Sequence, residues 1–133
     1  PEFSMEGNEG ASEARERWYF KLRCENREYQ TYCAAFEWVR QALKMNRAVL
    51  SPTACAEVET PVLLFQSGRD IWVLNNPQNR FVQLVKDGGG EADMVRYPES
   101  LHEIFSMPNA IYKPYLERIL SFYDDPMIAS ATY

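Results

Sequence analysis

The chain has 133 residues and a net charge of −5, and this length suits one domain rather than two. Apolar residues make up 46% of the chain and charged residues 25%, which excludes a disordered or collagen-like protein. The 14 basic residues against 19 acidic ones argue against a nucleic acid partner, whose phosphates require a basic surface. Apolar runs such as 62–65 are far too short to cross a membrane, and no signal-peptide pattern begins the chain.

The cysteine and histidine content argues against a metal site. Cys24, Cys33 and Cys55 cannot all pair with one another, and no CxxC spacing joins them. Because His102 is the only histidine, we expect no structural zinc, no other metal and no cofactor. The three thiols are therefore interpreted as small, half-buried apolar side chains in a reducing compartment.

The two ends of the chain are expected to lie outside the fold. Residues 1–4 resemble a cloning remnant, since Glu2-Phe3 is what a common restriction site encodes. We therefore interpret 1–10 as a flexible leader and 126–133 as a tail.

The segment 11–57 is predicted to be helical. Ser12 is a candidate cap for a first helix, on which Trp18 and Leu22 share one face four residues apart. A polar connector follows at 25–33.

A second helix is predicted over 34–48. Phe36, Val39 and Leu43 recur there at helical spacing. Pro52 pushes the residue before it out of the helical region, so the second helix should end before that point.

The segment 58–125 has a different pattern of apolar residues and contains two predicted strands. The first, at 61–66, is apolar without interruption, which is typical of a parallel strand covered on both faces. The second, at 92–97, stops at Pro98.

Two helices are predicted around these strands. One begins near Pro77 with Asn75 or Asn76 as its cap, and three consecutive glycines at 88–90 end it. The other is expected at 112–123. The order strand, helix, strand, helix predicts an α/β fold with two parallel strands joined by a crossover helix.

Asp70 and His102 each follow a predicted strand by a few residues. Because parallel strands end at the same edge of a sheet, the two loops should lie close enough for these side chains to hydrogen-bond. In such a pair the carboxylate fixes the imidazole tautomer while the histidine acts as a base. The alternative is a solvated aspartate and an exposed histidine that never meet.

Five segments carry a resemblance to a known family. The stretch TPVLLFQSGRDIWV at 60–73 closely resembles the acid-bearing strand and loop of α/β-hydrolases. The stretches NNPQNRF at 75–81 and YPESLHEIF at 97–105 resemble the bacterial lysophospholipase and monoacylglycerol-lipase branch of that superfamily. The stretches RERWY at 15–19 and FEWVRQAL at 36–43 are similar to the cap helices of that branch.

The resemblance runs from about residue 11 to residue 125 and implies a partial α/β-hydrolase fold, with a cap-derived segment at 11–57 and the C-terminal part of the core at 58–125. It also implies a serine esterase mechanism on lipid fatty-acyl esters, with Asp70 and His102 as two members of a triad. Its implied location is the cytoplasm or the periphery of the bacterial inner membrane. The implied walls of an acyl site are four aromatic residues, Trp18, Tyr19, Phe36 and Trp38, which can equally be ordinary core or cap residues.

The nucleophile of that family is missing from this sequence. The family carries its serine in a Gly-x-Ser-x-Gly elbow, and none of the eight serines here, Ser4, Ser12, Ser51, Ser67, Ser100, Ser106, Ser121 and Ser130, is flanked in that way. Ser67 and Ser100 lie near Asp70 and His102 in sequence but are more simply polar loop residues.

The sequence therefore predicts the C-terminal part of a lysophospholipase-like hydrolase that is inactive alone. Such a piece should leave one strand edge and both faces of 62–65 bare, so its partner would be the missing N-terminal half or another copy of itself. The alternatives are a non-catalytic, self-associating module and an artificially excised piece.

Overall fold

A computed structural model describes residues 2–30 and 33–124 and shows a mixed α/β arrangement. Its two strands, β1 (Val62–Ser67) and β2 (Ala92–Tyr97), run parallel in one sheet with Val62 opposite Ala92 and Ser67 opposite Tyr97. Both predicted strands and their parallel pairing are confirmed. The expected tail at 126–133 lies outside the described residues.

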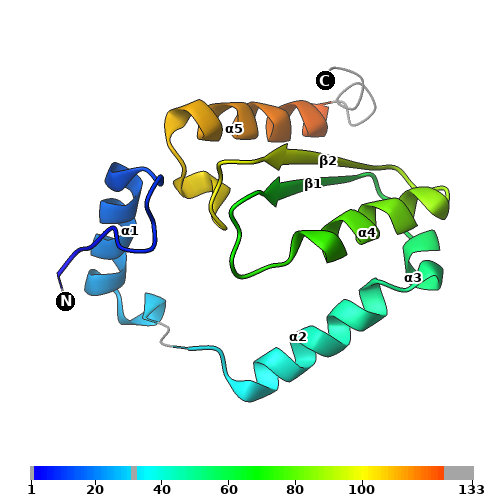
Figure 1. Ribbon diagram of the computed structural model, residues 1–133, viewed down its shortest axis with the longest axis horizontal. Helices are drawn as coiled ribbons and strands as arrows, with labels where there is room; N and C mark the ends of the chain where they lie inside the picture. The colour runs from blue at the N-terminus through cyan, green and yellow to red at the C-terminus, as the bar shows by residue number, and fades with distance from the viewer. Residues whose placement is uncertain (1, 31–32, 125–133) are drawn as a thin grey trace.

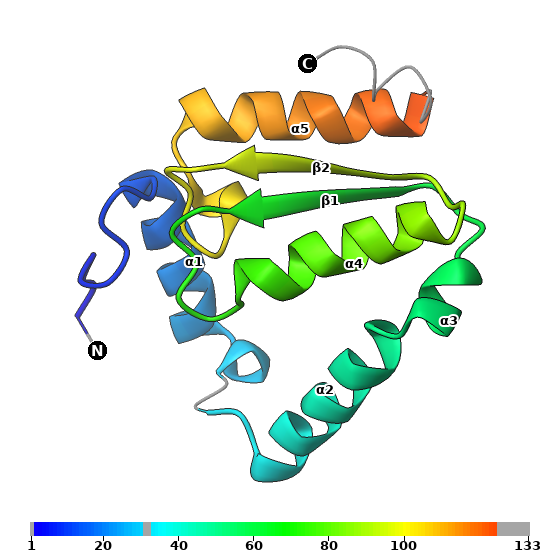
Figure 2. The same cartoon turned by 45° about the vertical axis from the view of Figure 1, so that its right-hand side comes forward.

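Helices cover both faces of this sheet (Figures 1 and 2). Helix α4 (Asn75–Asp87) connects the strands and buries Val82 and Val85 beneath them. Helix α5 (Asn109–Asp124) covers the opposite face, where Tyr115 packs edge-on against the ring of Phe65. The residues 62–65 are half-buried, so the expectation that both their faces would be bare is wrong.

Several predicted helix boundaries are corrected by the structure. Helix α4 begins at Asn75 with Leu74 as its cap residue, so neither Asn75 nor Asn76 caps it as expected. Helix α5 begins at Asn109, three residues before the predicted start, and contains Pro114. Its first turn precedes the apolar residues from which the prediction was made.

The N-terminal half forms three helices, α1 (Glu13–Glu25), α2 (Phe36–Val49) and the short α3 (Pro52–Ala56). The first two were predicted, although the side chain of Ser12 makes no capping hydrogen bond. The third was not predicted. Ser51 caps it by accepting a hydrogen bond from the N–H of Ala54, so Pro52 ends one helix and begins the next.

Helix α1 is attached to the segment that precedes α5. The guanidinium of Arg15 donates to the carbonyl of Met107 at 2.7 Å and to Oδ1 of Asn109 at 2.6 Å. The N–H of Ser12 donates to the carbonyl of Ser106, which lies in the 3-10 turn η2 (Ile104–Ser106). These bonds place α1 beside the loop that carries His102.

Another 3-10 turn, η1 (Arg27–Tyr29), directly follows α1 in the chain.

Candidate active site

The loops that follow β1 and β2 are joined by backbone hydrogen bonds. The N–H of Gly68 donates to the carbonyl of Tyr97, and the N–H of Arg69 donates to the carbonyl of Ser100, each at 2.9 Å. Gly68 is required here, because a β-carbon at that position would lie 2.3 Å from the carbonyl oxygen of Pro98. The close approach brings the next residues of both loops together.

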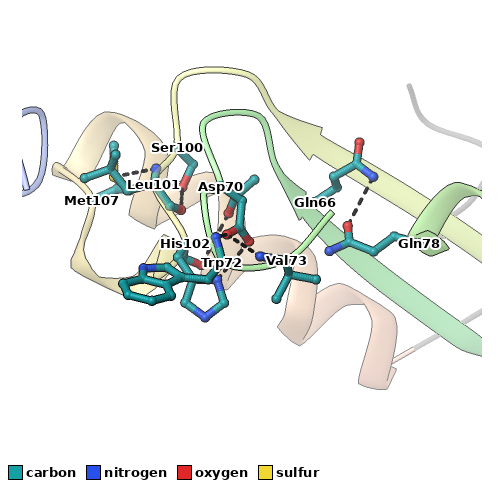
Figure 3. A network of polar contacts seen from close by, with 10 residues as sticks. Gln66, Asp70, Trp72, Val73, Gln78, Ser100, Leu101, His102 and Met107 are labelled. Carbon is teal, nitrogen blue, oxygen red and sulfur yellow. Dashed lines mark hydrogen bonds and ion pairs between the residues drawn. The ribbon is translucent and has the colours of Figure 1, made fainter. Parts of the chain in front are cut away.

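Asp70 and His102 are hydrogen-bonded at this edge (Figure 3). Nδ1 of His102 lies 2.8 Å from Oδ2 of Asp70. The other carboxylate oxygen of Asp70 accepts from the N–H groups of Trp72 at 2.8 Å and Val73 at 2.9 Å. The Asp70 side chain is 5% exposed and that of His102 is 45% exposed, so the carboxylate is covered while the imidazole is open to solvent.

The surroundings of Asp70 favour its charged form. Burial raises the pKa of this carboxyl. The hydrogen bond from His102 and those from the N–H groups of Val73 and Trp72 lower the pKa, and together they outweigh the effect of burial. Its pKa therefore lies below the ordinary value for aspartate. A charged Asp70 can orient the imidazole and stabilise a positive charge on it.

A cleft of about 1460 Å³ opens beside the Asp70–His102 pair. Two of the four predicted wall residues, Tyr19 from α1 and Trp38 from α2, line this cleft. Trp18 lines a separate, smaller depression beside Arg15 instead. Phe36 lines neither the cleft nor this depression, and it is 97% exposed. The prediction that Trp18 and Phe36 form walls of the cleft is therefore not supported.

The serines near the pair make hydrogen bonds to other groups. The hydroxyl of Ser67 donates to the carbonyl of His102 at 3.4 Å, and that of Ser100 to the carbonyl of Leu101 at 2.9 Å. Ser106 lines the cleft, but its hydroxyl donates to Glu103 at 3.4 Å. In the part of the chain that the structure describes, no serine hydroxyl is hydrogen-bonded to the imidazole of His102.

Two residues at this edge were not singled out from the sequence. Trp72 follows Asp70 in the loop and lines the cleft. Gln66 is fully buried at the end of β1 and donates to Oδ1 of Asn79 at 2.8 Å and to Oε1 of Gln78 at 3.1 Å (Figure 3). The signal for Gln66 was a polar residue at the end of an otherwise apolar strand.

The interpretation of the three cysteines as half-buried is wrong, because Cys24 and Cys33 are exposed and Cys55 is buried. The described residues contain no group of three histidine, cysteine or acidic side chains that could hold a metal ion. Across 2–30 and 33–124, no helix has the length and apolar character needed to cross a membrane. Comparison of the chain with protein-family models, with curated proteins and with solved structures gave no match.

Proposed function

We propose that this chain carries the aspartate and histidine of a Ser-His-Asp site that hydrolyses fatty-acyl esters of the lysophospholipid class. The observation that carries the proposal is the 2.8 Å hydrogen bond between Asp70 and His102 at the carboxyl edge of two parallel strands. That edge is where open α/β sheets place ligands. The resemblance of 60–73 and 97–105 to lysophospholipase-like hydrolases supports the same assignment.

Each residue of the pair has a defined role in this mechanism. His102 takes the proton of the attacking serine hydroxyl and later gives it to the leaving alcohol, while Asp70 orients the ring. The serine comes from a polypeptide segment outside this sequence, and the proposed place of action is the cytoplasm or the periphery of the bacterial inner membrane. Tyr19 and Trp38 would contact the acyl chain across the cleft. We therefore expect the chain alone to leave lipid esters intact.

The test is complementation with a serine-bearing half. The chain is mixed with the N-terminal half of a lysophospholipase-like hydrolase that contains the elbow serine and ends before the cap. We expect the mixture, and neither half alone, to release fatty acid from lysophosphatidylcholine and to react with a fluorophosphonate probe.

Variants assign that activity to the site. His102→Gln should abolish both signals, while Glu99→Gln, at an exposed position that does not line the cleft, should retain them. A mixture that stays silent although the two halves bind each other would contradict the proposal. Labelling of a serine in this chain alone would contradict it as well.

A second candidate, a self-associating interaction module, is favoured by α2. This helix buries none of its residues, although Phe36, Leu43 and Met45 are large and apolar. Exposed apolar patches of this kind mark surfaces that bind other proteins. Measurement of the mass in solution tests this candidate, because a self-associating module should have a mass above that of the single chain.

A further inference from the structure

The hydrogen bond to Asp70 determines which nitrogen of His102 is available for chemistry. A carboxylate only accepts hydrogen bonds, so Nδ1, at 2.8 Å, is assigned as the protonated nitrogen. In the neutral ring, Nε2 then carries the free lone pair. Figure 3 shows one ring nitrogen facing Asp70 and the other directed away from it.

That lone pair has no hydrogen-bond partner among the described residues. The hydroxyls of Ser67, Ser100 and Ser106 all donate to other oxygens. The His102 side chain is nearly half exposed and lines the cleft. A molecule in the cleft can therefore reach Nε2 without displacing a protein group.

We infer that His102 is itself a nucleophile, which transfers the acyl group of activated aryl esters to water through an acyl-imidazole. Histidine is one of the side chains that form covalent intermediates in catalysis. This activity requires no serine, so it goes beyond the proposed function and does not depend on a second polypeptide. Apolar acyl groups are favoured because Phe20, Trp38 and Trp72 line the same cleft.

The reaction balances with water as the only co-reactant. The Nε2 lone pair forms a bond to the ester carbonyl carbon, the carbon–oxygen bond to the aryl group breaks, and its electron pair leaves on the phenolate. Asp70 stabilises the positive charge of the acylated ring through Nδ1. Water then adds to the acyl carbon and gives up a proton, which neutralises the released phenolate through the solvent, and the carbon–nitrogen bond breaks and returns the lone pair to Nε2. One ester and one water give one acid and one phenol.

The leaving group determines the substrate class. The adduct of imidazole and ester carbonyl can expel either imidazole or the alcohol, and it expels the weaker base. A nitrophenolate is about as weak a base as imidazole and competes with it as the leaving group, whereas the alkoxide of a lipid ester is a far stronger base and does not. The chain alone should therefore hydrolyse nitrophenyl esters and leave lysophospholipids intact.

The experiment follows nitrophenyl octanoate hydrolysis by the full chain, with His102→Gln and Glu99→Gln as matched variants, because Glu99 is exposed and does not line the cleft. We expect the chain and Glu99→Gln to exceed His102→Gln by about 10²-fold, the low end of what a positioned catalytic group contributes. Circular dichroism of each variant confirms that its fold is retained. Equal rates for the chain and a folded His102→Gln variant would overturn the inference.

A trapping measurement distinguishes the nucleophile from a general base and from reactive lysines. Acid quenching followed by peptide mass spectrometry should place the octanoyl group on the peptide that contains His102, and hydroxylamine should remove it. Octanoyl groups found only on lysine, stable to hydroxylamine, would overturn the inference. So would a His102-dependent rate with no adduct and a large solvent isotope effect, because that result indicates a general base. Every one of these outcomes leaves the complementation result with lysophosphatidylcholine unaffected.

Discussion

At the scale of single residues, the Asp70 carboxylate does two things at once. One oxygen holds the loop by accepting from the N–H groups of Trp72 and Val73, and the other orients His102. Protonation of Asp70 should therefore weaken the hydrogen bonds that hold the loop and the one that orients the imidazole. The change of folding stability with pH measures the effect of this protonation.

The lowered pKa of Asp70 predicts a loss of stability in acid. Because the unfolded chain binds this proton more readily, the contribution of Asp70 is fully present above the unfolded pKa of aspartate, and it is lost as the pH falls through the lower folded pKa. Charged hydrogen bonds contribute about 1.5–3 kcal/mol, and we expect about 1 kcal/mol because the histidine partner is half exposed.

The measurement is urea unfolding at several pH values between neutral and strongly acidic. Asp70→Asn should be less stable than the native chain at neutral pH and lose less stability on acidification. Glu99→Gln, at an exposed position in the neighbouring loop, should follow the native profile. Parallel acid profiles for the native chain and Asp70→Asn would contradict this role of the carboxylate.

Gly68 sets the distance between the two loops that carry Asp70 and His102. A β-carbon there would lie within 2.7 Å of three backbone atoms of Pro98, and backbone cannot move aside as a flexible side chain can. We expect Gly68→Ala to cost about 1–3 kcal/mol of unfolding free energy. Glu117→Ala, on an exposed turn of α5, should cost far less in the same urea titration. Equal costs would show that the loops have room to separate.

At the scale of secondary structure, α2 and α4 share the same spacing of apolar residues but differ in how much of that apolar face they bury. Both have an apolar stripe at helical spacing, and both were predicted as helices. Helix α4 buries Val82 and Val85 against the sheet, whereas α2 buries no residue. Periodicity thus indicates that a helix forms and which face is apolar, but not what that face contacts.

The closeness of the loops that carry Asp70 and His102 could be predicted because it follows from strand direction, whereas the hydrogen bond between the two side chains was one of two open alternatives. Two strands with a helix between them run parallel, and residues a few positions beyond their ends meet at one edge. The positions of the aromatic residues could not be predicted in this way. Trp18 and Tyr19 are adjacent in α1 and line different depressions, because successive residues point about 100° apart around a helix. What each of them faces depends on how α1 is attached through Arg15, which the sequence does not indicate.

A pair of substitutions distinguishes the buried junction between η2 and α5 from the exposed face of α2. Met107 is 2% exposed at the junction of η2 and α5, so Met107→Ala should cost about 2–5 kcal/mol. Leu43 on α2 is more than half exposed, so Leu43→Ala should change the stability by less than about 0.5 kcal/mol. Urea titration at a protein concentration low enough to keep the chain monomeric measures both values. A large cost at Leu43 under these conditions would mean that α2 packs against the rest of its own chain.

At the scale of the whole molecule, the small core contrasts with a large apolar surface. The buried apolar residues in the described ranges are only five, Cys55, Val82, Val85, Ile104 and Met107. Exposed large apolar side chains include Phe36 and Leu43 on α2 and Ile71, Trp72 and Leu74 in the loop after Asp70. In addition, β1 pairs with β2 alone among the described residues, so its other edge can accept a strand. Burial of these apolar side chains and pairing of the free strand edge would lower the free energy of the protein.

We therefore predict that the chain associates with itself when no other partner is present. Sedimentation equilibrium should give a mass above 15.5 kDa that rises with protein concentration. Because burial of apolar surface drives the contact, sodium sulfate should strengthen it, and Phe36→Ser together with Leu43→Ser should weaken it. Arg80→Ser, an exposed polar substitution on α4, should leave the mass unchanged. A monomer at every concentration would remove the physical reason for the self-associating module. The N-terminal half of a hydrolase would then remain the proposed partner for the free edge of β1.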